Sequence, residues 1–420
     1  MRPGDTGHRP PMQPQGATSP GVHCAKLSGL EKRAGAARSA TTVRIAIVGP
    51  FFFPQLDGVE KVMLNHARHL VRRGHEVHVV TSFLRYPTGR FERVPAREEM
   101  EGFTIHRLPV RVAKPNWRFA YLNNGGLVIQ GLVATLRRIG PDVLHAHQIA
   151  APAWAFGAAW YAWTRRRRFF YSPHYHPDMQ PGQEGQYRLL HGLNALPIGI
   201  ARRIFHLTRV DHAPFLAEYP KARPDRLAVL PNGVDPPRDL PRPVRPPEEA
   251  VFLFVGRVDE HRKGFDLLRT AFARLRRPGW RLDVIGRISD ATRASLAAEF
   301  GDAVRVLGLV DEGSLEAAYA EADVFVMPSR YEGFGMPFIE AMRYGVPAIG
   351  TAIGGVPEVV PEGTGLLIPL NDVDALTAAM RRLGESPAER AAMGTAGKAW
   401  SARFLWEEIV AGLEQDYRTA

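Results

Sequence analysis

The stretch VRIAIVG at residues 43–49 decides the fold class of this chain. It is a continuous apolar run, rich in β-branched residues, that stops at Gly49-Pro50, as expected of a strand buried on both faces. Residues 58–74, GVEKVMLNHARHLVRRG, then carry apolar side chains at helical spacing and end on a glycine. EVHVVT at residues 76–81 is the next predicted strand, so the three segments predict a strand–helix–strand unit.

The same alternation continues to residue 235 and restarts at residue 250. Further strands are predicted in FTIHRLPV, PDVLHAHQ, RRFFYSPH and RLAVLPNGVD, and later in AVFLFVGRVD, WRLDVIGR, AVRVLGLV, ADVFVMPS and VPAIGT, with helices between them. Repeated alternation predicts a parallel sheet with helices on both faces, and the proline-rich residues 236–250 predict a linker between two such sheets. We therefore expect an α/β chain with two doubly wound, Rossmann-like domains at residues 43–235 and 251–400.

The two ends of the chain have different expected structures. Residues 1–42 are rich in Pro, Gly, Ser and Arg, and we expect them to form a disordered basic tail. The pattern of residues 399–420 predicts one amphipathic helix. We treat it as a separate unit after the two domains, over residues 401–420. Its apolar side is formed by Phe404, Leu405, Ile409, Val410 and Leu413.

Composition and charge narrow the class of protein. The chain has 420 residues, 45% of them hydrophobic and 23% charged, which is typical of a globular protein with more than one core. A single cysteine, Cys24, allows no internal disulfide, so we expect a cytoplasmic location. The net charge of +11 divides into +4 for residues 1–42, +13 for residues 43–230 and −6 for the rest. A basic first half could attract the anionic inner face of a membrane or an acidic substrate, whereas no nucleic-acid recognition module is found.

The apolar stretch IAAPAWAFGAAWYAWTRRRR at residues 149–168 allows two interpretations. It could be a membrane-spanning segment, or the crossover helix that the strand alternation requires at this place. The second is favoured because the apolar part is short for a bilayer. Residues 165–168 would then lie at a helix C-terminus, where the helix dipole stabilises cations.

Ligands of open α/β sheets bind at the carboxyl ends of the strands, and these ends carry cations here. The turn after the first strand opens a helix at Gly58, where backbone amides favour an anion. The loop VGRVDEHRKG in the second half contains Arg257 and Lys263, which could neutralise a diphosphate or could simply be solvated.

The segment YEGFGMPFIE at residues 331–340 places two carboxylates around a Gly-Phe-Gly turn. Glu332 is predicted in a loop, beside free backbone amides of residues 333–335, and Glu340 one turn into a helix that has proline in its first turn. Carboxylates at these places suit hydrogen bonds to the vicinal hydroxyls of a sugar or ribose. The alternative is that both glutamates cap the helix or interact with its N-terminal dipole.

Histidines and aspartates at other strand ends raise the question of a metal. His145 and His147 share one face of a strand end, and His174 and His176 repeat the spacing, yet no further ligand is evident, so we expect hydrogen bonding. The Asp-x-Asp of residues 372–374 opens a helix, which capping explains better than a divalent ion. No metal and no cofactor are therefore expected.

These segments resemble the retaining, GT-B-fold glycosyltransferases of family 4, also called glycosyl transferases group 1. The resemblance spans residues 43 to about 415 and is most specific in three segments: FVGRVDEHRKGFDLL, the run from GLVDEGSLEAAYAEADVFVMPSRYEGFGMPFIEAMRYGVPAIG to GGVPEVV, and GTGLLIPLNDVDALTAAM. VLPNGVD at residues 229–235 is similar to the family's segment before the linker.

The resemblance implies that a nucleotide-sugar donor binds mainly to the second domain, the acceptor docks on the first, and the C-terminal helix crosses back to the first. The residues that it assigns to the catalytic and donor-binding site are Arg257 and Lys263 on the diphosphate, Glu340 on the ribose, Glu332 near the anomeric centre, amides around Phe334 and Gly335, His147 on the transferred sugar, Gly58 in the phosphate loop, and Val310 on the donor side. It further implies metal-independent, front-face transfer in which the leaving diphosphate accepts the acceptor's proton.

Two departures from the family pattern affect the expected pocket. Asp57 replaces the first of two paired glycines and would be unfavourable beside a phosphate, and Arg287 replaces part of a short glycine-containing loop. A GT-B phosphorylase or epimerase is one alternative function, and the linear order around EGFGMPFIE argues against it. A catalytically silent binding module is the other: the intact site residues weigh against it, whereas Asp57 keeps it open. The sugar, the base (UDP- and GDP-sugars both occur in the family) and the glycan, lipid-linked or small-molecule acceptor are not encoded in any motif.

Overall fold

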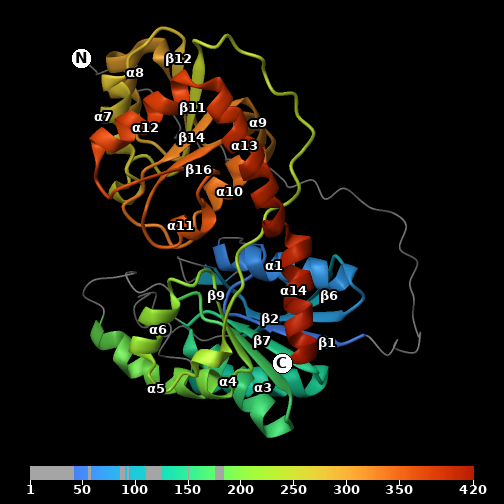
Figure 1. Ribbon diagram of the computed structural model, residues 1–420. Helices are drawn as coiled ribbons and strands as arrows, with labels where there is room; N and C mark the ends of the chain where they lie inside the picture. The colour runs from blue at the N-terminus through green and yellow to red at the C-terminus, as the bar shows by residue number, and fades with distance from the viewer. Residues whose placement is uncertain are drawn as a thin grey trace, which may run out of the picture. The chain divides into compact units, whose positions relative to one another are not determined.

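A computed structural model describes residues 42–54, 58–85, 90–91, 94–109, 125–149, 151–175 and 184–420 of the chain. Two α/β domains, each built on its own parallel sheet, make up this part (Figure 1). The expected tail at residues 1–42 lies almost wholly outside the described residues, as do Cys24, Asp57 and His176.

The first sheet has eight strands in the order β10-β9-β8-β7-β1-β2-β6-β5. Their bounds are β1 Arg44–Val48, β2 Glu76–Ser82, β5 Arg97–Met100, β6 Phe103–Leu108, β7 Val143–His147, β8 Arg168–Ser172, β9 Arg203–His206 and β10 Leu227–Val229; the short strands β3 Leu84–Arg85 and β4 Arg90–Phe91 pair separately. The strand of VRIAIVG is central, because Ile45 pairs with Val77 of β2 on one side and with Val143 of β7 on the other. All pairings are parallel except that of the edge strand β5 with β6, which the alternation pattern does not predict.

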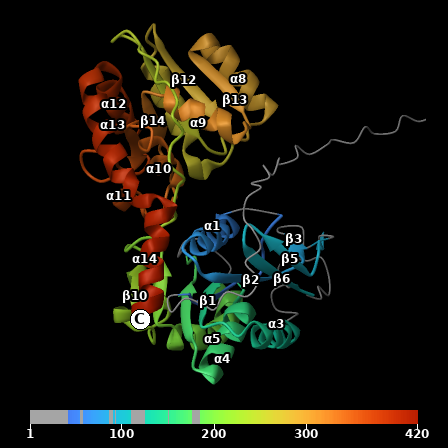
Figure 2. The same ribbon diagram turned by 90° about the vertical axis from the view of Figure 1, so that its right-hand side faces the viewer.

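Helices cover both faces of the first sheet, and the direction of each crossover decides which face. The bounds are α1 Gly58–Arg72, α3 Gly125–Ile139, α4 Pro152–Arg165, α5 Glu184–Ile200 and α6 His212–Glu218. Right-handed connections that run from β6 to β7, β8 and β9 place α3, α4 and α5 on one face, and the opposite step from β1 to β2 places α1 on the other (Figure 2). Separate hydrophobic clusters lie on these two faces.

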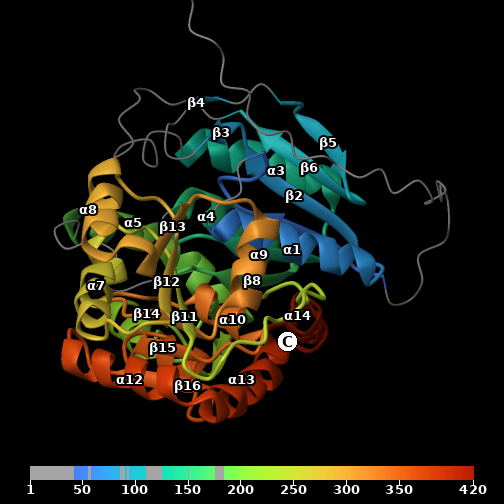
Figure 3. The same cartoon turned by 90° about the horizontal axis from the view of Figure 1, so that it is seen from above.

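The second sheet has six parallel strands in the order β13-β12-β11-β14-β15-β16. The strands are β11 Ala250–Val255, β12 Trp280–Ile285, β13 Val304–Gly308, β14 Val324–Met327, β15 Ala348–Thr351 and β16 Gly365–Ile368, and the helices are α7 Phe265–Arg274, α8 Asp290–Phe300, α9 Glu312–Glu321, α10 Met336–Met342, α11 Val356–Val359, α12 Val373–Glu385 and α13 Pro387–Ser401. α7 packs beside α12, and α10 packs against α9 and α13 (Figure 3). These elements enclose one continuous core. Asp372 caps α12 by accepting a hydrogen bond from the Ala375 amide at 2.8 Å, which is the capping role expected for it.

The C-terminal segment differs from the single helix expected over residues 399–420. α13 ends at Ser401, a 3-10 turn follows at Ala402–Phe404, and α14 runs over Trp406–Thr419. The predicted apolar side is divided at this turn: Phe404 is buried in the core of the second sheet, whereas Ile409, Val410 and Leu413 are buried in the first. The last helix therefore crosses back to the first domain, as the family resemblance implied.

The interpretation of residues 149–168 as a membrane-spanning segment receives no support from the structure. In the described part of the chain, no helix has both the length and the apolar character that crossing a bilayer requires. The stretch forms the crossover helix α4 instead, with four consecutive arginines at its end and Arg166 as its left-handed C-cap.

Candidate active site

Each sheet has one point where the strand order reverses, and the site residues lie beside these points. In the second sheet the reversal is between β11 and β14, and in the first between β1 and β7. Loops that leave neighbouring strands in opposite directions open a crevice at the carboxyl ends, where ligands of doubly wound folds bind. Arg257 and Lys263 follow β11, Glu332 follows β14, and His147 ends β7.

Lys263 and Glu332, which the sequence analysis treated separately, form an ion pair. The Lys263 Nζ donates to the Glu332 Oε2 at 2.7 Å, and both side chains are largely shielded, at 22% and 14% exposure. Gly264 allows this approach because its φ is +68° and an added Cβ would lie 1.9 Å from the Pro328 carbonyl oxygen. The loop after β11 is thus pressed directly against the loop after β14.

Arg257 occupies a more open position in the same loop. Its guanidinium is 66% exposed and is held 2.6 Å from the Glu260 carboxylate, whose pKa it lowers by hydrogen bonding. An arginine whose side chain is exposed can turn to a diphosphate at modest cost, because surface ion pairs are weak. Glu260 was not singled out from the sequence, although its spacing of three residues from Arg257 permits the pair.

Glu340 is oriented by a residue that the sequence analysis did not identify. The hydroxyl of Tyr319, on α9, donates to the Glu340 Oε2 at 2.8 Å. Tyr319 is fully buried, and burial, with the nearby Glu340 charge, raises its pKa well above 10, so the phenol stays protonated and remains a donor. The other oxygen of Glu340 is thereby left in a fixed direction.

Helix capping does not explain the two glutamates. The N-cap of α10 is Gly335, with φ of +92°, and no side chain caps the helix there. The Phe334 ring is buried and lies 6.0 Å from the ring of Phe404, so this residue can offer a ligand only its backbone. The alternative prediction that Glu332 and Glu340 cap this helix is therefore wrong.

Histidines gather at the reversal point of the first sheet. His147 is fully buried, and its Nδ1 lies 2.9 Å from the His174 Nε2, whereas its Nε2 has no partner among the described residues. His145 has a structural role, because its two ring nitrogens form hydrogen bonds with the Tyr417 hydroxyl at 2.6 Å and the Ser172 hydroxyl at 2.8 Å. His147 is thus the residue of the pair that retains a free polar atom.

His66 of α1 completes this group and was considered only as a helix residue. Its ring lies 5.7 Å from that of His147 and 5.9 Å from that of His145, and neither of its nitrogens has a partner in the described part of the chain. Burial lowers the pKa of His66 to about 3, with the charges of His174 and His69 acting in the same direction. Burial also lowers the pKa of His145 and His147 well below 6.5, so the group is neutral at physiological pH.

The three histidines are close enough to hold a metal ion, with one ring nitrogen from each within 4.8 Å of the others. His145 would have to give up one of its two hydrogen bonds to serve as a ligand. The group therefore matches a hydrogen-bonding site at least as well as a metal site.

The remaining predicted donor residues have simple placements. Gly58 begins α1, and an added Cβ would meet no atom of the described residues within 4 Å. Val310 is half-buried, between β13 and α9, and packs against the core. Arg287 is exposed after β12, and its carbonyl accepts from the Val258 amide at 3.0 Å.

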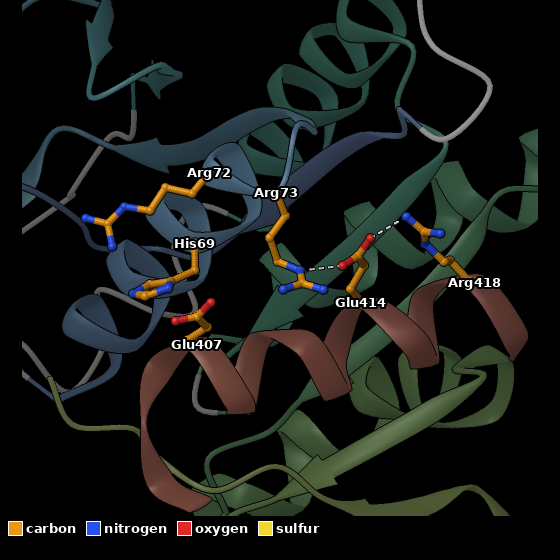
Figure 4. A pocket seen from close by; sticks show the side chains of 6 residues that line it. All are labelled: His69, Arg72, Arg73, Glu407, Glu414 and Arg418. Atoms are coloured by element: carbon orange, nitrogen blue, oxygen red, sulfur yellow. Dashed lines mark hydrogen bonds and ion pairs between the residues drawn. The ribbon is translucent and has the colours of Figure 1, made fainter. Parts of the chain in front are cut away.

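A separate hollow of about 510 Å³ lies between α1 and α14 (Figure 4). Its centre is Glu414, toward which Arg73 and Arg418 both point, and the buried His75 lies 3.0 Å from the same carboxylate. His69, Arg72 and Glu407 complete the lining. These contacts join α14 to α1 and the turn that follows it, and we interpret the hollow as a structural junction.

Comparison with protein families agrees with this geometry. Residues 56–238 match the model for "Glycosyltransferase Family 4", and residues 237–400 match the model for "Glycosyl transferases group 1". The chain belongs to glycosyltransferase family 4. It is therefore a glycosyltransferase that transfers a sugar from a nucleotide-sugar donor, and both the family and the GT-B fold class expected from the sequence are confirmed.

Individual relatives and solved structures resemble this glycosyltransferase over 37% to 90% of its length. It is 29% identical over 405 residues to a D-inositol 3-phosphate glycosyltransferase of Corynebacterium aurimucosum, covering 86% of this chain and 91% of the relative. A GDP-mannose-dependent monoacylated phosphatidylinositol monomannoside mannosyltransferase of Corynebacterium glutamicum is 34% identical over 172 residues, or 37% of this chain and 45% of the relative. Sucrose-phosphate synthase from Thermosynechococcus elongatus has the same fold, with a TM-score of 0.69 at 22% identity over 90% of this chain and 98% of that one.

Proposed function

We propose that this glycosyltransferase moves a hexosyl unit from a UDP- or GDP-linked sugar to an acceptor hydroxyl with retention of the anomeric configuration. The observation that carries the proposal is the Lys263–Glu332 pair at the reversal point of the second sheet, with Arg257 in the same loop. A shielded cation beside a carboxylate, at the place where doubly wound sheets bind ligands, suits a diphosphate joined to a polyhydroxylated sugar.

Each residue then has a distinct part in the reaction. Lys263 and Arg257 bind the diphosphate and stabilise the negative charge that grows on it as the bond from the anomeric carbon to the phosphate oxygen breaks. The acceptor oxygen forms its new bond on the same face of the sugar, and its proton passes to the leaving phosphate oxygen. Glu332, kept in place by Lys263, accepts hydrogen bonds from sugar hydroxyls, and the carboxylate of Glu340 accepts them from the ribose.

His147 supplies the first sheet's contribution. Its Nε2, which is buried and has no partner among the described residues, is the atom that we assign to a hydroxyl of the transferred sugar, and the lowered pKa keeps the ring neutral. Because burial lowers its pKa well below 6.5, the ring is a weak base and competes poorly for the acceptor's proton, which favours the diphosphate as the base.

We further propose that the reaction needs no metal ion. Lys263 and Arg257, each paired with a carboxylate in this structure, are the cationic groups that would act on the diphosphate in place of a divalent ion, and Asp372 is used in capping. The relatives named above act on inositol phosphate and on a phosphatidylinositol mannoside, which makes phosphorylated or lipid-linked polyols the first acceptors to try. A cytoplasmic enzyme that works at the inner membrane surface would suit the lipid-linked case.

Slow hydrolysis of the donor tests the stereochemistry without knowledge of the acceptor. GDP-mannose and UDP-glucose are incubated with the enzyme, and the anomer of the sugar first released is followed by proton NMR, with Lys263→Ala as the inactive control. Release of the α-anomer from these α-linked donors is expected, and first release of the β-anomer would contradict retention. Addition of EDTA should leave the rate unchanged; a loss that Mg²⁺ or Mn²⁺ restores would refute the metal-independent mechanism.

A further inference from the structure

Helix α4 exposes aromatic side chains that its position in the fold does not require. The helix buries a face of small residues, among them Ala155, Ala158 and Ala162, against the first sheet. On the outer face, Trp160 and Trp163 are 43% and 58% exposed. The apolar character of this stretch is therefore two-sided, with one face in the core and the other in solvent.

The two exposed tryptophans and the half-buried Phe156 form a continuous stripe. The ring centroids of Phe156 and Trp160 are 6.4 Å apart, and those of Trp160 and Trp163 are 5.4 Å apart. Spacings of four and three residues place all three on one side of a helix. Tryptophan and phenylalanine in contact with water lose the free energy that burial would give, so a stripe of them indicates a surface that becomes covered.

Cations without acidic partners lie at the end of this stripe. Arg165 and Arg166 are exposed at the C-terminus of α4, and neither forms an ion pair with any described residue. Arg137 and Arg138 are exposed at the C-terminus of α3, which packs beside α4 and runs in the same direction. Arg167 is the exception, since it contacts the Asp142 carboxylate at 3.2 Å.

The whole helix layer on this face is almost free of negative charge. α3 and α4 contain no Asp or Glu, and α5 contains only Glu184. The opposite layer is different, because α14 alone carries Glu407, Glu408, Glu414 and Asp416. The helices α3 and α4 therefore present cations with no acidic side chain of their own to neutralise them.

We propose that the aromatic–basic face of α4, formed by Phe156, Trp160, Trp163, Arg165 and Arg166 with Arg137 and Arg138 beside it, docks on an anionic lipid bilayer. Tryptophan is suited to the boundary between head groups and acyl chains, and each arginine near an anionic surface strengthens binding. The shape of the face agrees, because an outward helix surface can lie on a plane. A second copy of the chain fits less well, since a two-fold interface on this face would set unpaired arginines against each other.

The docking itself is independent of the transfer reaction; only its use in reaching a lipid-linked acceptor rests on the proposed function. Binding is measured by sedimentation with vesicles of phosphatidylcholine alone and with added phosphatidylglycerol, at low and high salt. The full chain should bind the anionic vesicles and release them as salt rises, while retaining a salt-resistant part that the tryptophans supply.

Two double variants test the face. Trp160→Ser/Trp163→Ser should weaken vesicle binding roughly ten-fold or more, because each exposed ring loses its burial in the interface. Arg165→Ser/Arg166→Ser should weaken it by about 25-fold at low salt and much less at high salt. Arg276→Ser/Arg381→Ser, which removes the same charge from exposed positions of the second domain, is the matched control and should bind like the unmodified protein.

Several results would overturn the proposal. They are failure of the unmodified chain to bind anionic vesicles, equal loss in the matched control, and undiminished binding by both α4 variants. Sedimentation velocity adds another: a dimer that Trp160→Ser/Trp163→Ser converts to a monomer would assign the face to self-association. Donor hydrolysis by the same variants should be unchanged, so a failure of docking is distinguishable from a failure of the proposed catalysis.

Discussion

Replacing His66 should remove about 2 kcal/mol of the loss in stability that the protein suffers between pH 8 and pH 5. His66 is fully buried, and burial, followed by the charges of His174 and His69, lowers its pKa to about 3 from 6.5. The unfolded chain binds a proton on this residue below pH 6.5 and the folded chain does not. The contribution of His66 to stability is therefore complete above pH 6.5 and declines as the pH falls.

The magnitude follows from the two pKa values. Between pH 6.5 and pH 3 unfolding takes up about one proton at His66, which costs the folded state about 1.4 kcal/mol per pH unit. At pH 5 the accumulated loss is thus about 2 kcal/mol, and at pH 8 it is close to zero. His145 and His147 lower the stability at acidic pH in the same direction, but both are present in the unmodified protein and in the His66 variants that are compared.

Urea unfolding at intervals from pH 5 to pH 8, with EDTA present, measures the difference. His66→Leu and His66→Asn both lack the titrating ring, one without and one with polar atoms, so their stability offsets at pH 8 can differ. Both should nevertheless gain about 2 kcal/mol on the unmodified protein between pH 8 and pH 5. A stability difference that does not vary with pH would refute the argument that His66 is held neutral by burial.

Three further predictions concern the site and the last helix. Lys263→Ala should lower turnover by about 100-fold or more, the usual scale for one electrostatic stabiliser, and near-normal turnover in steady-state assays would remove Lys263 from the mechanism. Tyr319→Phe should weaken donor binding roughly ten-fold in calorimetry with little change in turnover, because it frees the Glu340 carboxylate; unchanged affinity would contradict that role. Glu414→Gln should cost about 2 kcal/mol of unfolding free energy at pH 7, since its exposed partners Arg73 and Arg418 are only partly desolvated. Burial opposes ionisation of Glu414, but its hydrogen bonds lower the pKa overall, so the cost should shrink as the pH falls below 4.5, and a constant cost would exclude the ion pairs.

Much of the fold follows from short-range pattern. VRIAIVG and the strands like it are recognisable because a strand covered on both faces must be apolar throughout. α8 lies between the strands of WRLDVIGR and AVRVLGLV, where the alternation predicted a helix. The break between α13 and α14 was missed because helical spacing continues through residues 402–405, where Phe404 belongs to one core and Ile409 to the other. Periodicity shows which side of a helix is apolar but not which sheet will cover it.

In the site, too, the sequence indicates which residues are candidates but not which residues they contact. Lys263 and Glu332 could each be selected from their positions in loops, yet their pairing joins residues 69 positions apart and depends on how two loops meet. Tyr319 has no sequence signal beyond that of an ordinary core aromatic, and only the packing of α9 beside α10 gives it Glu340 as a partner. The exposure of Trp160 was equally hidden, since its segment is apolar on both faces.

The central claim, that a nucleotide-sugar donor binds beside Lys263 and Glu340, is tested most directly by thermal unfolding with UDP, GDP, ADP and their common sugar conjugates. A ligand at 100 times its dissociation constant adds about 2.7 kcal/mol to the stability of the folded state. We predict a raised midpoint with the nucleotides of one base, lost in Glu340→Ala and retained in Glu362→Ala, an exposed glutamate of the same domain. No shift with any nucleotide, or a full shift in Glu340→Ala, would contradict the account.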